Sequence, residues 1–154
     1  MNILAIDPGT HCGYALMDTM TKTILASGVW ELSIGRHEGG GMRFVRLRRY
    51  IADIIQSSAD VVFYEEVKRH MGTDAAHIYG GIIAVITSEC EGHAPPIPYK
   101  GIPVGTIKRV ATGKGNADKE KMMDAAAARW PEHKCKDDNE ADARWLAVAA
   151  LEYV

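Results

Sequence analysis

Three acidic residues stand at the ends of segments that are otherwise apolar. Asp7 closes the run 1–6, and Glu65 follows the run 61–64. Asp142 lies near the start of the last apolar segment of the chain. A charge at the edge of a hydrophobic core is unfavourable unless another group neutralises it. Oxygen ligands without a cluster of histidine or cysteine favour Mg²⁺ or Mn²⁺ over zinc. The three carboxylates therefore predict a shared site for divalent metal ions.

The elements that carry these acids must bring them together. The first two acids follow runs that are nearly continuous in apolar residues, which is typical of strands buried on both faces. Neighbouring strands lie about 5 Å apart, so Asp7 and Glu65 can meet at one edge of a sheet. On a helical wheel, Asp142 falls with Leu146 and Ala149 on the side expected to pack on that sheet. Carboxylates this close cannot all remain ionised without a cation.

The start of the last helix also has an explanation that involves no metal. Acids in a first turn interact favourably with the helix macrodipole, and Asp137 with Glu140 resembles a capping box. This interpretation accounts for Asp137, Asp138 and Glu140, and the wheel places Glu140 with Arg144 on the side opposite Asp142. It does not account for Asp142, which is expected to point inward.

The remaining elements follow from the spacing of apolar residues and from turn residues. Two strands after the first are predicted to form an antiparallel meander with it. Helices are predicted where apolar residues recur at helical spacing. The pattern favours one α/β domain over residues 1–154, with a mixed sheet. The expected elements beyond the two buried strands are strands at 14–17, 24–32 and 97–99, and helices at 42–57, 73–91, 103–112, 117–130 and 139–153.

Composition limits the classes of protein that fit. Hydrophobic residues make up 47% and charged residues 25% of the 154 residues, which is typical of a globular domain. No apolar run approaches the ~20 residues of a membrane helix, and the first strand lacks the length and basic flank of a secretory signal. Three cysteines, far apart and without metal-ligand spacing, favour a reduced protein of the cytoplasm.

Basic residues are unevenly distributed, although the net charge is only −2. Clustered arginines and lysines commonly form a solvated helix face. The functional interpretation is that basic surfaces flank an acidic pocket that gathers metal ions. The two clusters consist of Arg36, Arg43, Arg46, Arg48 and Arg49, and of Lys100, Lys108, Arg109, Lys114, Lys119 and Lys121.

Four motifs, in this order and spacing, resemble the RuvC-type Holliday junction resolvases, which belong to the RNase H-like nuclease superfamily. They are I-D-P-G-T at 6–10 with Gly13-Tyr14, the strand that leads into Glu65, G-K-G-x-A-x-K at 113–119, and N-E-A-D-A at 139–143. The resemblance covers most of the chain. It implies a five-stranded mixed sheet flanked by helices, in which the first three strands are antiparallel.

The resemblance also implies four metal-binding positions and two Mg²⁺ ions, for which Mn²⁺ would substitute. Asp7, Glu65 and Asp142 match three of these positions. The fourth position is Asn139, where family members usually carry Asp or His, so the neighbouring Asp138 is an alternative ligand. The implied reaction is phosphodiester hydrolysis that leaves 5′-phosphate ends, with Lys119 offsetting the charge that builds on the phosphate.

The implied substrate is branched DNA, above all the four-way junction, which a homodimer would cut by paired symmetric nicks. Lys108 and Lys119 match basic residues that hold DNA near the scissile phosphate, and Lys114 is expected to assist. Lys68 and Arg69 stand where bacterial chromosomal members place an aromatic residue, which favours phosphate contact over stacking and a closer likeness to phage members. The helix at 73–91 is the candidate dimer interface, although the glycine pair within it could equally pack inside the monomer.

Other functions remain open on the sequence. A related nuclease could use the same carboxylates on flaps, replication forks or RNA–DNA hybrids. The asparagine at position 139 also leaves room for a catalytically silent protein that binds branched DNA. An actin-like ATPase is disfavoured because that fold needs two such domains, so no nucleotide cofactor is expected, and no membrane partner is expected either.

Overall fold

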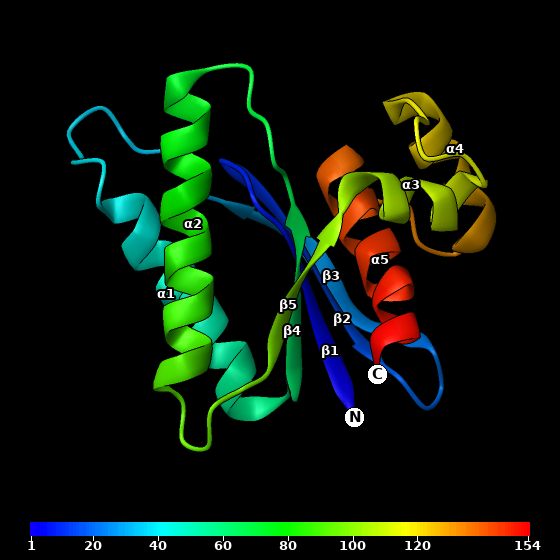
Figure 1. Ribbon diagram of the computed structural model, residues 1–154, viewed down its shortest axis with the longest axis horizontal. Coiled ribbons are helices and arrows are strands. Elements are labelled where there is room, and N and C mark those ends of the chain that lie inside the picture. Colours follow the sequence, from blue (N-terminus) through cyan, green and yellow to red (C-terminus); the bar gives the residue numbers. More distant parts are fainter.

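A computed structural model describes residues 1–154 and contains one five-stranded sheet with the strand order β3-β2-β1-β4-β5 (Figure 1). The first three strands pair antiparallel, and β4 and β5 continue the sheet parallel to β1. The fold class expected from the sequence is therefore confirmed. The strands are β1 (Asn2–Asp7), β2 (His11–Asp18), β3 (Thr23–Glu31), β4 (Val61–Glu66) and β5 (Tyr99–Pro103).

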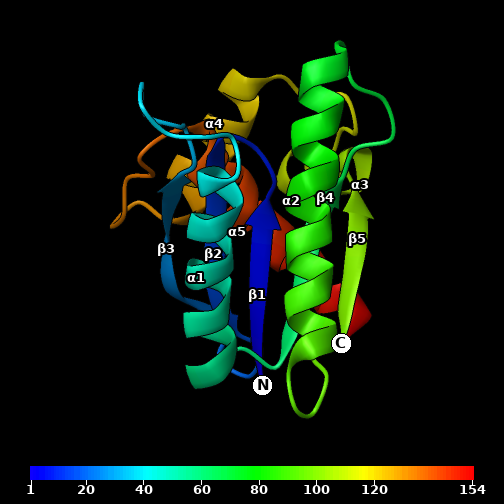
Figure 2. The same cartoon turned by 90° about the vertical axis from the view of Figure 1, so that its left-hand side faces the viewer.

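Five helices cover the two faces of the sheet. Figure 2 shows α1 and α2 side by side across one face, and Figure 1 shows α3, α4 and α5 on the other. None of them combines the length and hydropathy that crossing a bilayer requires. The helices are α1 (Met42–Ser57), α2 (Thr73–Gly92), α3 (Val104–Thr112), α4 (Lys119–Arg129) and α5 (Asp138–Ala150), and a 3₁₀ turn (Leu151–Tyr153) follows α5.

Strand β1 is apolar throughout because it supplies both hydrophobic cores. Successive side chains of a strand point to opposite faces of the sheet. Ile3 and Ala5 belong to the core under α5, whereas Leu4 and Ile6 belong to the core under α1 and α2. By the same alternation, Asp7 points to the face that α5 covers. The sequence pattern thus fixes the side of the sheet on which the first acid lies.

Gly13 sets how closely α5 approaches the sheet. It lies opposite Asp7 in the β1–β2 ladder. A Cβ atom at this position would lie 2.0 Å from the backbone oxygen of Asn139, at the start of α5. Any side chain would therefore push α5 away from β2. Because Gly13 has no side chain, the start of α5 can pack directly against the edge of the sheet where β1 ends.

Several boundaries differ from the predicted ones for local reasons. The edge strand begins at Tyr99 rather than residue 97 and runs to Pro103 beside β4. Helix α4 begins at Lys119 because the Asp118 side chain accepts a hydrogen bond from the Lys121 N–H at 2.9 Å, which caps the helix. Regular α-helix ends at Ala150, and the last turn tightens to 3₁₀ geometry.

The glycine pair of α2 packs within the monomer at one of its two positions. A Cβ atom on Gly81 would lie 2.4 Å from the Phe44 ring of α1, so this glycine admits an aromatic side chain between the two helices. Nothing lies within 4 Å of the corresponding position on Gly80. Gly81 is therefore explained by the contact between α1 and α2, and Gly80 is not.

Candidate active site

Asp7 and Glu65 lie beside each other at the carboxyl ends of β1 and β4. The two strands are parallel, and Ile6 pairs with Tyr64, so the residues that follow are neighbours in register. Adjacent strands lie about 5 Å apart. Phe63 belongs to the core under α5, and the alternation of the strand therefore turns Glu65 to the α5 side as well. Glu66 points to the opposite face, which supports the choice of Glu65 over its neighbour.

Helix α5 adds the third acid to this edge of the sheet. Asp142 and Glu65 line a common cavity of about 170 Å³, together with Lys108 from α3 and Lys119 from the first turn of α4. Five elements therefore converge on one small region: β1, β4, α3, α4 and α5. The structure brings together the three acids and two of the lysines that the sequence singled out.

The carboxyl groups raise one another's pKa values. Burial raises the pKa of Asp7 well above its usual value, and the negative charges of Glu65 and Asp142 raise it further. Burial, then the charge of Asp142, raises the pKa of Glu65 to about 7, against a smaller lowering by Lys108. Burial and the charge of Asp138 raise the pKa of Asp142 to about 6, although Lys108 and Lys119 oppose this. The two lysines only partly offset the negative charge.

The donor chemistry of this cluster fits a hard divalent cation. All three groups are carboxylates in an environment where their charge is poorly compensated, and a cation would favour the ionised forms. The side chains do not converge into a finished cage, since no three or more His, Cys, Asp or Glu side chains lie close enough to hold an ion as they stand. The arrangement is a set of carboxylates gathered at one edge of the sheet, without a preformed cage.

The two candidates for the fourth position differ in their partners. Asp138 forms an ion pair with Lys119, with 2.9 Å between Oδ2 and Nζ. The Asn139 side chain makes no hydrogen bond within the protein. The expected helix cap is formed, because the Asp137 side chain accepts a hydrogen bond from the Glu140 N–H at 3.1 Å. Asp138 is thus engaged by a lysine, whereas the Asn139 amide is free to bind a ligand.

The other basic residues singled out in the sequence lie outside the cavity. Lys114 is exposed on the turn after α3, where Gly113 adopts a left-handed conformation with φ of 81°. Lys68 and Arg69 are exposed in the segment that follows β4. None of these three forms an ion pair in the structure. Their positions leave them accessible to a polyanion that approaches the carboxylate edge.

Tyr79 of α2 holds the end of β4 and was missed in the sequence. Its hydroxyl donates a hydrogen bond to the Glu65 carbonyl at 3.0 Å and accepts one from the Val67 N–H at 3.0 Å. The His70 ring lies 4.6 Å from the Tyr79 ring. Both residues line a cavity of about 380 Å³ beside the Pro8–Thr10 turn. No periodicity or motif links position 79 to position 65, so only the fold reveals this contact.

Glu140 and Arg144 are both 3% exposed, which corrects the helical-wheel assignment of a face turned away from the sheet. Helix α5 contacts β1, β2 and β3 and also α3 and α4, so it has almost no solvent-exposed side. Glu140 accepts hydrogen bonds from Ser27 Oγ at 2.6 Å and from the Lys136 N–H at 2.6 Å. The helix therefore has polar side chains packed inside the protein on two sides rather than one.

Comparisons with known proteins agree with this architecture. No protein-family model matches the chain. The curated crossover junction endodeoxyribonuclease RuvC of Synechococcus sp. (strain WH7803) is 30% identical over 156 aligned residues, which cover 97% of this chain and 96% of that protein. The solved structure of Thermus thermophilus RuvC has a TM-score of 0.81 at 19% identity and matches 99% of this chain and 95% of its own.

Two structures that contain DNA are also similar in fold. T. thermophilus RuvC in complex with a Holliday junction substrate has a TM-score of 0.82 at 19% identity, covering 99% of this chain and 94% of that one. The Fowlpox virus resolvase in complex with Holliday junction DNA has a TM-score of 0.62 at 16% identity, covering 99% of this chain and 98% of that one.

The strand order 3-2-1-4-5, with acids at the ends of β1 and β4 and on α5, defines the RNase H-like class of α/β folds. The identity to the Synechococcus protein, which extends over nearly the whole of both chains, places the molecule within that class. The chain belongs to the RuvC family of crossover junction endodeoxyribonucleases. The family resemblance seen in the sequence motifs is confirmed, and the closer likeness to phage members stays a prediction.

Proposed function

We propose that this protein is a structure-selective endonuclease that depends on a divalent metal and resolves four-way DNA junctions by paired symmetric nicks. The observation that carries the proposal is the group of three acids from β1, β4 and α5, which raise one another's pKa values beside two lysines. The names of its relatives support the substrate, since two similar folds were solved with Holliday junction DNA.

Asp7, Glu65 and Asp142 would hold the metal, with Asn139 as the preferred fourth ligand because Asp138 pairs with Lys119. Two Mg²⁺ ions are proposed per site, with Mn²⁺ as a substitute. When bound, they would activate water and stabilise the leaving 3′ oxygen. Burial and the charges of Glu65 and Asp142 raise the pKa of Asp7, which supports Asp7 as one of the metal ligands.

The lysines of the cavity would position the scissile phosphate. Lys108 and Lys119 line the same cavity of about 170 Å³ as Glu65 and Asp142. A phosphate bound in this cavity would therefore lie within reach of both ammonium groups. The ion pair with Asp138 keeps the Lys119 ammonium at this site before the substrate arrives. Lys119 would then stabilise the additional negative charge that develops as the phosphate is attacked. The products would carry 5′-phosphate ends.

The wider DNA contacts and the assembly are part of the same proposal. Lys114, Lys68 and Arg69 would bind backbone phosphates of the junction arms. Paired nicks require two sites related by two-fold symmetry, so a homodimer is proposed, with α2 at its interface. We place the protein in the cytoplasm of a bacterium or of a phage-infected host, in keeping with three buried free cysteines.

The decisive experiment is incubation of the purified protein with a synthetic four-way junction and Mg²⁺. Symmetric nicks with 5′-phosphate ends in the wild type, absent in Asp142→Asn, would support the proposal. Flaps, forks and RNA–DNA hybrids of the same sequence serve as competing substrates. Preferential cutting of one of these structures would identify it, rather than the four-way junction, as the substrate. Junction binding without any metal-dependent nicking would identify a silent branched-DNA binder.

A further inference from the structure

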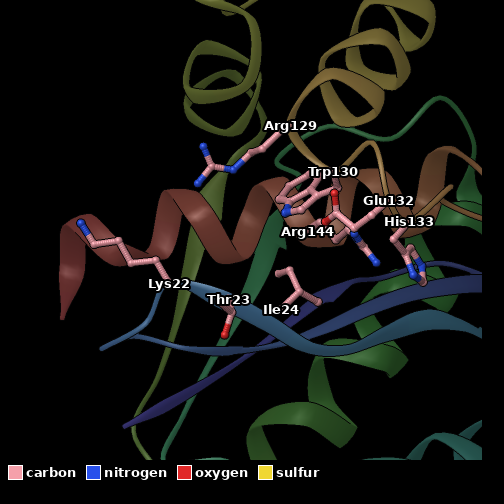
Figure 3. Close-up of a pocket in the computed structure, with 8 residues that line it drawn as sticks. All are labelled: Lys22, Thr23, Ile24, Arg129, Trp130, Glu132, His133 and Arg144. Carbon is pink, nitrogen blue, oxygen red and sulfur yellow. The ribbon is translucent and has the colours of Figure 1, made fainter.

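A second cavity, of about 550 Å³, has Arg144 of α5 in its lining (Figure 3). It is formed by the start of β3, the C-terminal end of α4 with the segment that follows, and one residue of α5. None of its residues lines the carboxylate cavity. The eight lining residues are Lys22, Thr23, Ile24, Arg129, Trp130, Glu132, His133 and Arg144.

The lining of this cavity is mainly cationic and aromatic. Figure 3 shows the Trp130 indole between Arg129 and Ile24 of β3, with Arg144 beside it. The Arg144 guanidinium lies 5.2 Å from the centre of the Trp130 ring, and the Arg129 guanidinium lies 5.5 Å from it. Two guanidinium groups therefore surround one indole. Glu132 is the only acid in the lining.

Arg144 is buried but retains hydrogen-bonding capacity. Its Nε donates to Ser27 Oγ at 2.9 Å, and its Nη2 lies 3.5 Å from Glu140 Oε1, which is too long for a good hydrogen bond. A guanidinium has five N–H donors, so most of those on Arg144 have no partner in the protein. No Arg144 nitrogen is both fully buried and unpaired, so the donors without a protein partner reach solvent. The cavity is the space into which these donors open.

Glu140 leaves N–H groups of Arg144 unpaired, because the Glu140 carboxylate accepts its hydrogen bonds from other groups. Burial would raise the pKa of the Glu140 carboxyl, but hydrogen bonds from the Lys136 N–H, Ser27 and His133, with the charge of Arg144, outweigh burial and lower the pKa. Glu140 is therefore ionised, and three hydrogen-bond donors other than Arg144 bind its carboxylate. Arg129 has no carboxylate partner at all. The cavity thus offers free guanidinium donors to a ligand.

We propose that this cavity binds a phosphate group through Arg144 and Arg129, with the Trp130 indole as its apolar wall. Guanidinium groups match phosphate oxygens in geometry and charge, and a partly buried site strengthens the interaction. The phosphate could belong to a DNA strand or to free phosphate or a nucleotide. The DNA source rests on the proposed nuclease function, whereas phosphate binding does not.

Helix α4 connects the two cavities, which supports a DNA strand as the source of the phosphate. Its first residue, Lys119, lines the carboxylate cavity, and its last residue, Arg129, lines the second cavity. Eleven residues of α-helix span about 16 Å at 1.5 Å per residue. A duplex arm that places one phosphate at the carboxylates could place another at Arg129. The second cavity would then fix the direction of that arm.

The first test uses inorganic phosphate and the indole N–H signals of the three tryptophans in ¹⁵N-labelled protein. Phosphate should move the Trp130 signal in a saturable manner at constant ionic strength, while Trp30, on the other face of the sheet, serves as the internal control. Arg129→Ala should abolish saturation. Lys134→Ala removes a nearby exposed charge outside the cavity and should leave the titration unchanged.

The second test measures binding of a four-way junction in EDTA over a series of salt concentrations. Loss of one phosphate contact lowers the slope of log affinity against log salt by about 1. Arg129→Ala should show this decrease and Lys134→Ala should not. If phosphate titrates but the slope is unchanged, free phosphate or a nucleotide is the ligand and the cavity assignment stands.

Absence of a Trp130 shift together with an unchanged slope would overturn the proposal and leave the Arg144 cluster with a structural function only. Arg144→Lys keeps the positive charge but removes the forked guanidinium donors, so it should weaken phosphate binding. If Arg144→Lys does not fold, Arg129→Ala still tests the proposal. Nicking in Mg²⁺ is read separately. Its absence in the wild type would count against the nuclease function without affecting phosphate binding in EDTA.

Discussion

Asp142 and Glu140 lie two residues apart on one helix, the first partly buried and the second buried, and their pKa values shift in opposite directions. Burial and neighbouring acids raise the pKa of Asp142 to about 6. The pKa of Glu140 is lowered despite burial, because three hydrogen-bond donors and Arg144 surround it. The difference shows that partners, rather than depth, decide the state of a buried acid. The carboxylate edge lacks the compensation that the Glu140 cluster has, which supports the metal site proposed there.

The strongest way to test this contrast is to neutralise one acid of the uncompensated group. Asp7→Asn should lower junction cleavage by more than about 100-fold, since even residues that only support metal ligands contribute 10- to 100-fold. Without metal, its melting temperature should equal or exceed that of the wild type, because repulsion with Glu65 and Asp142 is relieved. Cleavage assays and thermal melts in EDTA measure the two effects. Asp53→Asn, at an exposed position of α1, is the matched control. Substantial residual cleavage would remove Asp7 from the metal site.

Neutralising the compensated acid should have the reverse outcome. Glu140→Gln leaves Arg144 buried without its counter-charge, and breaking such a pair lowers the free energy of unfolding by about 3 kcal/mol. Urea unfolding measures this loss. Glu132→Gln, at an exposed acid in the loop before α5, should change stability by no more than about 0.5 kcal/mol. Equal effects of the two variants would show that the Glu140 cluster contributes little to stability.

The pH dependence of stability separates the two groups further. The raised pKa values of Glu65, about 7, and Asp142, about 6, mean that the folded state binds protons more tightly than the unfolded state. Their contribution to stability is full below the ordinary values of 4.5 and 3.8 and is lost as pH rises through 6 to 7. Glu140 acts in the opposite sense, because its contribution is lost as pH falls through its lowered pKa.

Thermal melts at pH 5 and pH 7.5, with EDTA and with Mg²⁺, measure this difference. Mg²⁺ should stabilise the protein more at pH 7.5 than at pH 5, since ionised carboxylates bind it and protonated ones do not. Asp142→Asn should reduce that gain. Equal stabilisation at both pH values in the wild type would argue against a metal site at these acids.

The smallest expected effect concerns the tyrosine that holds Glu65 in place. Tyr79→Phe removes the hydrogen bonds to the Glu65 carbonyl and the Val67 N–H, and should lower stability by about 1 kcal/mol. If Tyr79 positions Glu65, kcat should fall several-fold while KM stays constant. A change in KM alone would instead indicate contact with DNA through the neighbouring cavity. Tyr99→Phe, with a hydroxyl bonded only to exposed Glu91, is the control.

Much of the fold could be predicted because its signals are local. The helix at 42–57 matched at both ends, since apolar spacing alone defines it. The acids at the ends of β1 and β4 were identified because a charge after an apolar run is conspicuous. The burial of Glu140 and Arg144 could not be predicted, because it depends on α5 being covered by a sheet and two helices at once. A helical wheel assumes that one side of the helix faces water.

The contact between Gly13 and Asn139 has a consequence for how this family can vary. Adding one methyl group at position 13 would meet the backbone of α5 rather than a side chain that could move aside. The helix would tilt or slide, and Asp142 would travel with it, while the ladder between β1 and β2 stayed intact. A chain could thus keep its sheet and lose its chemistry through a single carbon atom, added without changing any of the acids or lysines.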